Sequence, residues 1–158
     1  MFVELKKKYN SVVYKRRTVL SENTAAKWLN DGQLPQEQTQ IISEIEYFRR
    51  FYGSLVPSAF VSYDREAFFA VDGSDFRVTF DENISARTTD LSLKKDVGGE
   101  KLLGNGLVLM ELKTHSGIPL WMTSLLSENE IYKTSFSKYG TAYRTMIFPE
   151  KGEIKNVC

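Results

Sequence analysis

The alternation of charged and apolar residues in the first hairpin places the strongest constraint on this chain. Successive side chains of a strand point to opposite faces. Across residues 2–9, one face therefore carries Phe2, Glu4, Lys6 and Lys8. After a turn at Asn10-Ser11, residues 12–19 place Val13, Lys15 and Arg17 on a common face. The hairpin presents a column of basic side chains with one carboxylate among them. A surface hairpin facing water would look the same, so this pattern leaves both possibilities open.

Later strands repeat this division. The apolar residues Phe76, Val78 and Phe80 alternate with Arg77, Thr79 and Asp81. Residues 84–88 put Ser85 and Arg87 on one face, and residues 107–113 put Glu111 and Lys113 on one face. Two arrangements allow such strands. One is a sheet whose charged face meets water, and the other is a closed or nearly closed barrel with a charged, wet interior.

The remaining pattern predicts helices around these strands. Ser21 is expected to cap a helix over 22–30 that ends at Asp31-Gly32, and Pro35 to open a helix over 36–51. The second helix has an apolar stripe of Ile41, Ile42, Ile45, Tyr47 and Phe48. We further expect a strand over 59–69, a loop over 90–106 with a short edge strand, and helices over 119–126 and 141–147, the last after a polar junction at 135–140. The predicted fold class is α+β. In the barrel arrangement the strands would form an antiparallel β-barrel (tunnel) with the helices packed outside.

Composition narrows the possible partners. The chain has 158 residues and a net charge of +1, so it lacks the overall basicity typical of nucleic-acid-binding proteins. One cysteine, Cys158, and one histidine, His115, cannot form a Cys/His zinc site, and His115 is expected in a surface loop. The low cysteine content favours a reducing, cytoplasmic location. No apolar run reaches the length of a membrane span.

A barrel interior would bring basic residues close together. At a separation of about 6 Å and an effective dielectric near 20, each pair of cations costs roughly 3 kcal/mol. A chain of phosphates would relieve this repulsion, because Arg binds phosphate oxygens with two bonds and Lys adds point charge. Glu4 and Glu111, each within a Glu-Leu-Lys sequence, could hold a hard divalent cation. Alternatively, each glutamate could form a cross-strand ion pair.

Six motifs in order carry a family resemblance. They are 2–8 (FVELKKK), 14–17 (YKRR), 62–68 (SYDREAF), 77–81 (RVTFD), 109–113 (LMELK) and 136–140 (FSKYG). Together they resemble the VTC (vacuolar transporter chaperone) domain, the polyphosphate polymerase branch of the CYTH-like triphosphate tunnel metalloenzymes. The resemblance spans nearly the whole chain. It implies an antiparallel tunnel that binds ATP or triphosphate, inorganic polyphosphate and a divalent metal, manganese or magnesium.

The resemblance also implies roles for individual residues. Phosphate-binding roles in the tunnel are expected for Lys6, Lys8, Lys15, Arg17, Arg77, Arg87, Lys113 and, from the helical lid, Lys138. The catalytic set would be Lys15, Arg17, Arg77 and Glu111, with Glu111 and Glu4 as metal ligands. Arg65 could either pair with a neighbouring acid or face the tunnel.

The chain departs from the family pattern in how much of the domain it is expected to cover. Family members begin with about a further third of the domain, so residues 1–158 are expected to form a single domain equivalent to its C-terminal two-thirds. The tunnel would then be incomplete, and its open strand edges would favour self-association. The expected function is transfer of the γ-phosphate of ATP to a growing polyphosphate chain. The alternatives are hydrolysis of triphosphate or polyphosphate at the same site, and a non-catalytic polyphosphate-binding module.

Overall fold

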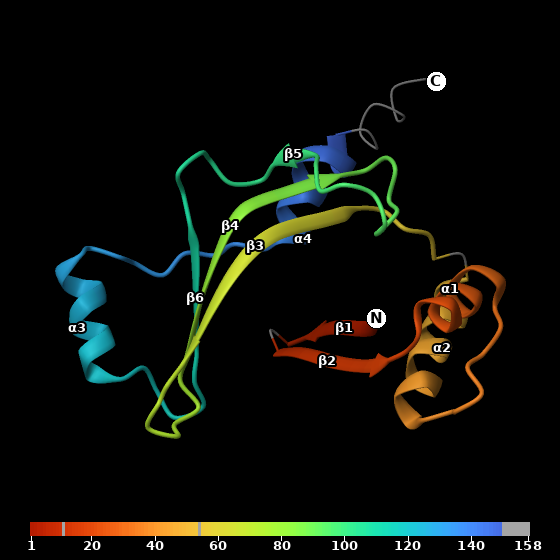
Figure 1. Ribbon diagram of the computed structural model, residues 1–158, viewed down its shortest axis with the longest axis horizontal. Helices are drawn as coiled ribbons and strands as arrows, with labels where there is room; N and C mark the ends of the chain where they lie inside the picture. The colour runs from red at the N-terminus through yellow and green to blue at the C-terminus, as the bar shows by residue number, and fades with distance from the viewer. Residues whose placement is uncertain (11, 54, 150–158) are drawn as a thin grey trace. The chain divides into compact units, whose positions relative to one another are not determined.

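The computed structural model describes residues 1–10, 12–53 and 55–149 (Figure 1). The chain divides into two compact units, Met1–Val56 and the residues from Pro57 onward, and each is described here by itself. Ser11 of the predicted turn and Cys158 lie outside the described residues.

The first unit is a hairpin packed on two helices. Strands β1 (Phe2–Tyr9) and β2 (Val12–Val19) pair antiparallel, with Glu4 opposite Arg17 and Lys6 opposite Lys15. This register confirms the predicted shared face. Val3 and Leu5 on the other face are buried in a core with Ala25 and Trp28 of α1 (Glu22–Asp31) and with Ile42 and Ile45 of α2 (Gln40–Tyr52).

Capping residues set where the helices of this unit begin and where α1 ends. The Ser21 hydroxyl accepts a bond of 3.1 Å from the Thr24 N–H, and Gly32 ends α1 with a φ of 74°, as predicted. Helix α2 begins four residues later than predicted, at Gln40 instead of 36, because Thr39 caps it through the Ile42 N–H at 3.3 Å. Pro35 is instead buried ahead of the helix. Tyr47, expected in the apolar stripe, is exposed.

A buried carboxylate ties the two helices of this unit together. Glu46 of α2 accepts bonds from the indole N–H of Trp28 at 2.8 Å, from Arg49 at 2.9 Å and from Arg50 at 2.7 Å. The bond from Arg49, with those from Arg50 and Trp28, lowers the pKa of Glu46 to about 2 against the opposing effect of burial. On the hairpin side, Arg16 of β2 binds Glu44 at 2.9 Å.

The second unit is a four-stranded antiparallel sheet centred on β4 (Arg77–Arg87). Strand β3 (Phe60–Phe69) pairs with one edge of β4, while β6 (Leu109–Lys113) and the short β5 (Glu100–Lys101) pair with the other. Helix α3 (Leu120–Glu128) covers the apolar face, where Met122 packs on Phe76 and Val78. A short helix α4 (Lys138–Ala142) continues into a π-helical turn, Tyr143–Ile147.

The structure corrects two boundaries in this unit. The strands predicted over 76–81 and 84–88 are one strand, because Asn83 adopts a left-handed conformation (φ 50°) that lets β4 continue. The register against β3 shifts here, because Asn83 and Ile84 of β4 lie between the partners of Ser62 and Asp64, where β3 has Tyr63 alone. The last helix starts at Lys138 and not at 141, because the Ser137 hydroxyl caps it. The edge strand expected within 90–106 is β5.

These elements confirm an α+β fold with antiparallel sheets. Within residues 1–10, 12–53 and 55–149 the strands form a two-stranded and a four-stranded sheet, and neither closes into a barrel. Among these residues, none of the helices combines the length and apolar character that crossing a bilayer requires.

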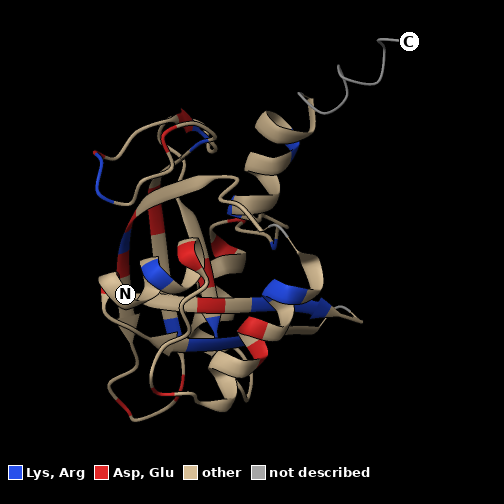
Figure 2. Ribbon diagram, turned by 90° about the vertical axis from the view of Figure 1, so that its right-hand side faces the viewer, with Lys and Arg blue, Asp and Glu red and all other residues tan. Residues whose placement is uncertain are grey.

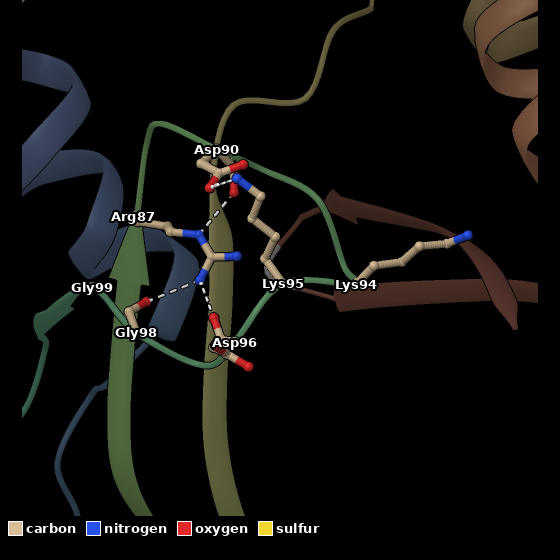
Figure 3. Close-up of a pocket in the computed structure, with 7 residues that line it drawn as sticks. All are labelled: Arg87, Asp90, Lys94, Lys95, Asp96, Gly98 and Gly99. Atoms are coloured by element: carbon tan, nitrogen blue, oxygen red, sulfur yellow. Dashed lines mark hydrogen bonds and ion pairs between the residues drawn. The ribbon is translucent and has the colours of Figure 1, made fainter.

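Arg87 organises the loop that follows β4 (Figure 3). Its guanidinium donates to the backbone carbonyls of Asp90 at 2.9 Å, Ser92 at 3.1 Å and Asp96 at 3.0 Å. Its plane also lies over the Phe60 ring, 3.8 Å from the centroid. Gly99 closes the loop against β4, where any side chain would clash with the Ala86 carbonyl.

The Glu46 contacts predict an acid-sensitive stability. A folded-state pKa below the ordinary 4.5 contributes stability that is complete above about pH 4.5 and is lost as the pH falls toward 2. We expect Glu46→Gln to lower the free energy of unfolding by about 2 to 3 kcal/mol at neutral pH. Urea titrations followed by Trp28 fluorescence, in a Trp121→Phe background, measure this. The difference from wild type should shrink below pH 4.5, whereas the exposed Glu37→Gln should change little at any pH.

Because the Arg87 guanidinium binds several backbone carbonyls, we expect the conformation of the loop after β4 to depend on its planar set of N–H donors. Arg87→Lys keeps the charge but cannot bind several carbonyls at fixed angles. We expect trypsin to cleave after Lys94 or Lys95 several-fold faster in this variant, with a matched Arg144→Lys exchange on the π-helical turn as control. Unchanged cleavage would show that Arg87 does not hold the loop.

Candidate functional site

The charged face of the four-stranded sheet gathers ionic side chains from three strands. On β4, Arg77, Thr79 and Asp81 share this face. The antiparallel register sets Lys113 of β6 opposite Arg77, Glu111 opposite Thr79, and Arg65 of β3 opposite Asp81. Residues far apart in the sequence therefore meet in adjacent rows of one surface.

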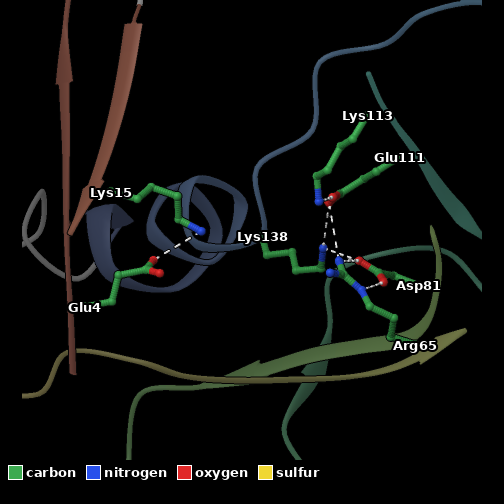
Figure 4. A network of polar contacts seen from close by, with 7 residues as sticks. All are labelled: Glu4, Lys15, Arg65, Asp81, Glu111, Lys113 and Lys138. Atoms are coloured by element: carbon green, nitrogen blue, oxygen red, sulfur yellow. Dashed lines mark hydrogen bonds and ion pairs between the residues drawn. The ribbon is translucent and has the colours of Figure 1, made fainter. Parts of the chain in front are cut away.

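Asp81 is the centre of this surface. It is fully buried, and Arg65 binds it with two bonds of 2.5 and 2.7 Å (Figure 4). Lys138, at the first residue of α4, also binds Asp81 and reaches the Glu111 carboxylate at 3.3 Å. Burial alone would raise the pKa of Asp81, but Arg65 and Lys138 outweigh it and hold that pKa below its usual range. Two cations thus keep a buried carboxylate ionised.

Glu111 joins the same network from β6. Its second carboxylate oxygen lies 3.1 Å from Lys113, and the Arg65 guanidinium lies 3.6 Å from its first. Burial opposes ionisation, yet the bond from Lys113 and the charge of Lys138 lower the pKa of Glu111. Beneath them, the Thr79 hydroxyl is buried without a hydrogen-bond partner among the described residues. Tyr63 completes the surroundings, with Lys138 4.5 Å and Arg65 5.1 Å from its ring centroid.

A groove of about 920 Å³ runs along β6 beside this network. The cations Arg77 and Lys113 line it together with Glu111, and Tyr132 and Phe136 contribute aromatic surface. Arg77 forms no ion pair within the described residues, so its charge is available to an anion in the groove. The groove thus offers an anion one cation without an ion pair among the described residues, Arg77, next to the paired Lys113 and Glu111.

The hairpin of the first unit carries the other predicted cations (Figure 2). Lys15 pairs with Glu4 at 3.3 Å, which realises the cross-strand ion-pair alternative for that glutamate. Arg17 lies over the Phe2 ring, 4.9 Å from its centroid. Lys6 and Lys8 are exposed and make no ion pair within the part of the chain that the structure describes.

The structure brings together some of the predicted site residues. Within the second unit, Arg77, Glu111, Lys113 and Lys138 share one surface, whereas Arg87 is taken up by its loop carbonyls. Arg65, for which two roles were open, pairs with an acid of this same surface. Asp81 was not singled out, although its place in the alternation of β4 put it on the charged face.

Comparison with known proteins identifies the family. The family model of the VTC domain matches residues 1–147. The chain belongs to the VTC domain family. A search of curated proteins and a search of solved structures each found no match. The match spans the VTC domain motifs of both compact units, from the hairpin to α4.

The residues of this VTC domain set limits on a metal site. Among the described residues there is no group of three or more His, Cys, Asp or Glu side chains arranged to hold a metal ion. Both oxygens of Asp81 are bound by Arg65 and Lys138. Glu111 is one-third exposed and faces the groove. Both oxygens of Glu111 also pair with cations, Lys113 at 3.1 Å and Lys138 at 3.3 Å. A metal bound mainly through phosphates needs only one or two carboxylates, so Glu111 would serve as a ligand only where it exchanges one of these lysines for the metal.

The burial of Asp81 predicts a strong effect of removing its charge. Asp81→Asn keeps the shape but leaves Arg65 and Lys138 without their buried counter-charge. We expect a loss of about 3 kcal/mol in the free energy of unfolding, measured by urea denaturation at neutral pH. The matched exchange Asp64→Asn, at an exposed carboxylate bound only by Asn83, should cost about 0.5 kcal/mol or less. Equal losses in both variants would contradict this role for Asp81.

Proposed function

We propose that this VTC domain binds chains of phosphate and transfers the γ-phosphate of ATP to a growing polyphosphate chain. The observation that carries the proposal is the meeting of Arg65, Lys138 and Lys113 around two carboxylates on one face of the sheet, beside a groove with the free cation Arg77. Membership of the VTC family supports a polyphosphate-related role.

The chemistry needs positioning and charge more than a protein nucleophile. A terminal phosphate oxygen of the acceptor chain attacks the γ-phosphorus, a new P–O bond forms, and the bond to the β–γ bridging oxygen breaks as ADP leaves. Charge spreads over the transferred group, and fixed cations stabilise it. Arg77 and Lys113, opposite one another on β4 and β6, would hold successive phosphates. Arg65 and Lys138, fixed by Asp81, would bind the transferring group without reorganising.

A divalent cation would be held by Glu111, which the resemblance also assigns as metal ligand. When bound, such an ion supplies positive charge that neutralises phosphate oxygens. Glu4, the second expected metal ligand, belongs to the first unit, where it pairs with Lys15 at 3.3 Å. The Thr79 hydroxyl, buried and unpartnered within the described residues, would donate to a phosphate oxygen or a water on the same face.

A closed tunnel would need additional strands. Within the described residues, β3 and β6 each pair only with β4, so each leaves one edge without a strand. Further strands of the same polypeptide or of a second copy could pair there. Lys6, Lys8, Lys15 and Arg17 of the hairpin stay proposed phosphate contacts, and so does Arg87, although loop carbonyls bind its guanidinium in this structure.

The test of this function is product analysis with ATP and manganese. Polymerase activity predicts long, phosphatase-sensitive polymer and stoichiometric ADP, whereas a hydrolase of the same site gives free phosphate. Lys138→Ala and Glu111→Gln should each reduce polymer formation at least tenfold, because Lys138 would stabilise the charge of the transferring group and Glu111 would hold the divalent cation.

A matched variant tests whether loss of any cation from the sheet lowers the yield. Lys101→Gln, on β5 at the other end of β4, removes one cation and should leave the product yield unchanged. Binding of long-chain polyphosphate without turnover, in this chain and in a version extended by the family's N-terminal strands, would instead identify a binding module. Undiminished polymer synthesis by Glu111→Gln in the presence of metal would overturn the metal role.

A further inference from the structure

A contact between two loop residues lies just beyond the row that Arg77 and Lys113 form on the charged face. Asp75 precedes Arg77 by two residues, and His115 follows Lys113 by two. The Asp75 carboxylate accepts the His115 backbone N–H at 2.5 Å and also binds the ring Nδ1. The contact joins the two chain segments at this end of the sheet, outside the paired strands.

This pair lines the groove with the cations of the proposed site. Asp75, Arg77, Lys113 and His115 all border the cavity along β6. The His115 side chain is 88% exposed, so it is open to a ligand in solution. Because Nδ1 is held by Asp75, the ring presents Nε2, which contacts no polar group among the described residues.

We propose that the Asp75–His115 pair is a further phosphate subsite at the end of this row, reached only by phosphate chains longer than a triphosphate. The inference rests on the proposed function, because the other rows must hold the rest of the chain. A strand advances about 7 Å every two residues, so each additional row requires a longer ligand. A triphosphate can be held by the rows of Glu111 and Lys113, whereas a longer chain extends to His115.

The subsite would respond to pH through the imidazole. In the neutral ring with Nδ1–H donated to Asp75, Nε2 is an acceptor and offers nothing to a phosphate oxygen. Protonation makes Nε2 a donor and adds a positive charge. The charged groups around it are Asp75 ahead of β4, Arg77 on β4, Lys113 on β6, and Lys133 of the segment after α3 that borders the same groove. The Asp75 charge opposes an anion, whereas Arg77, Lys113 and Lys133 supply positive charge to the groove that the pair borders.

The test measures binding of long-chain polyphosphate and of tripolyphosphate to the full chain by calorimetry, at about pH 5.5 and about pH 8. His115→Gln should weaken long-chain binding about three- to tenfold at the acidic pH and change it less than about twofold at the basic pH. Tripolyphosphate binding should be unaffected at both. His115→Arg should give long-chain binding at the basic pH that is as tight as that of the wild type at the acidic pH. Lys101→Gln serves as the control for loss of a cation elsewhere on the sheet.

Each outcome bears on the proposal separately from the proposed function. If His115→Gln binds long chains as the wild type does at both pH values, or weakens both ligands equally, the subsite is overturned while the proposed function stands. If His115→Arg leaves the pH dependence intact, the subsite is likewise overturned. If the wild-type chain binds neither ligand, both proposals fail together.

Discussion

The second unit depends on one buried negative charge. Asp81 has no exposed surface, and such a carboxylate is tolerable only when cations and hydrogen bonds replace the water it has lost. Arg65 from β3 and Lys138 from α4 do this from different directions. The same contact that satisfies Asp81 therefore joins a strand and a helix that are separated widely in sequence. It also fixes two cations in place before any ligand arrives.

The ion pairs around Asp81 explain why the charged side chains of this sheet lie together on one face. The apolar side is occupied by α3, through Met122 on Phe76 and Val78. The charged side is held together by reciprocal pairing, with Glu111 shared between Lys113, Lys138 and Arg65. Anchored cations lose little freedom when they bind an anion, which favours tight binding of a polyvalent ligand. Family membership and local electrostatics thus support the same class of ligand.

The sequence predicted the faces of the strands well, because alternation is a property of each strand alone. The shared face of Lys15 and Arg17, that of Glu111 and Lys113, and the cap at Ser21 were all confirmed. The start of α2 was wrong, since the Pro35 signal was overridden by the Thr39 cap. The pairing of Arg65 with Asp81 could not be chosen beforehand, because it depends on the register between strands. Likewise, the carbonyls that bind Arg87 come from a loop without any pattern in its sequence.

The left-handed residue in the middle of β4 has a further consequence. Before Asn83, β4 pairs with β6, and after Asn83 it pairs with β5. One continuous strand therefore pairs with two different strands along its length. Because side chains alternate, the count of residues across this bend decides which of them point inward beyond it. Ser85 and Ala86 are buried on opposite sides of the strand there. In evolution, a single-residue insertion at this position would exchange those two sides and displace the Arg87 loop, while the rows from Arg77 to Asp81 kept their pairing.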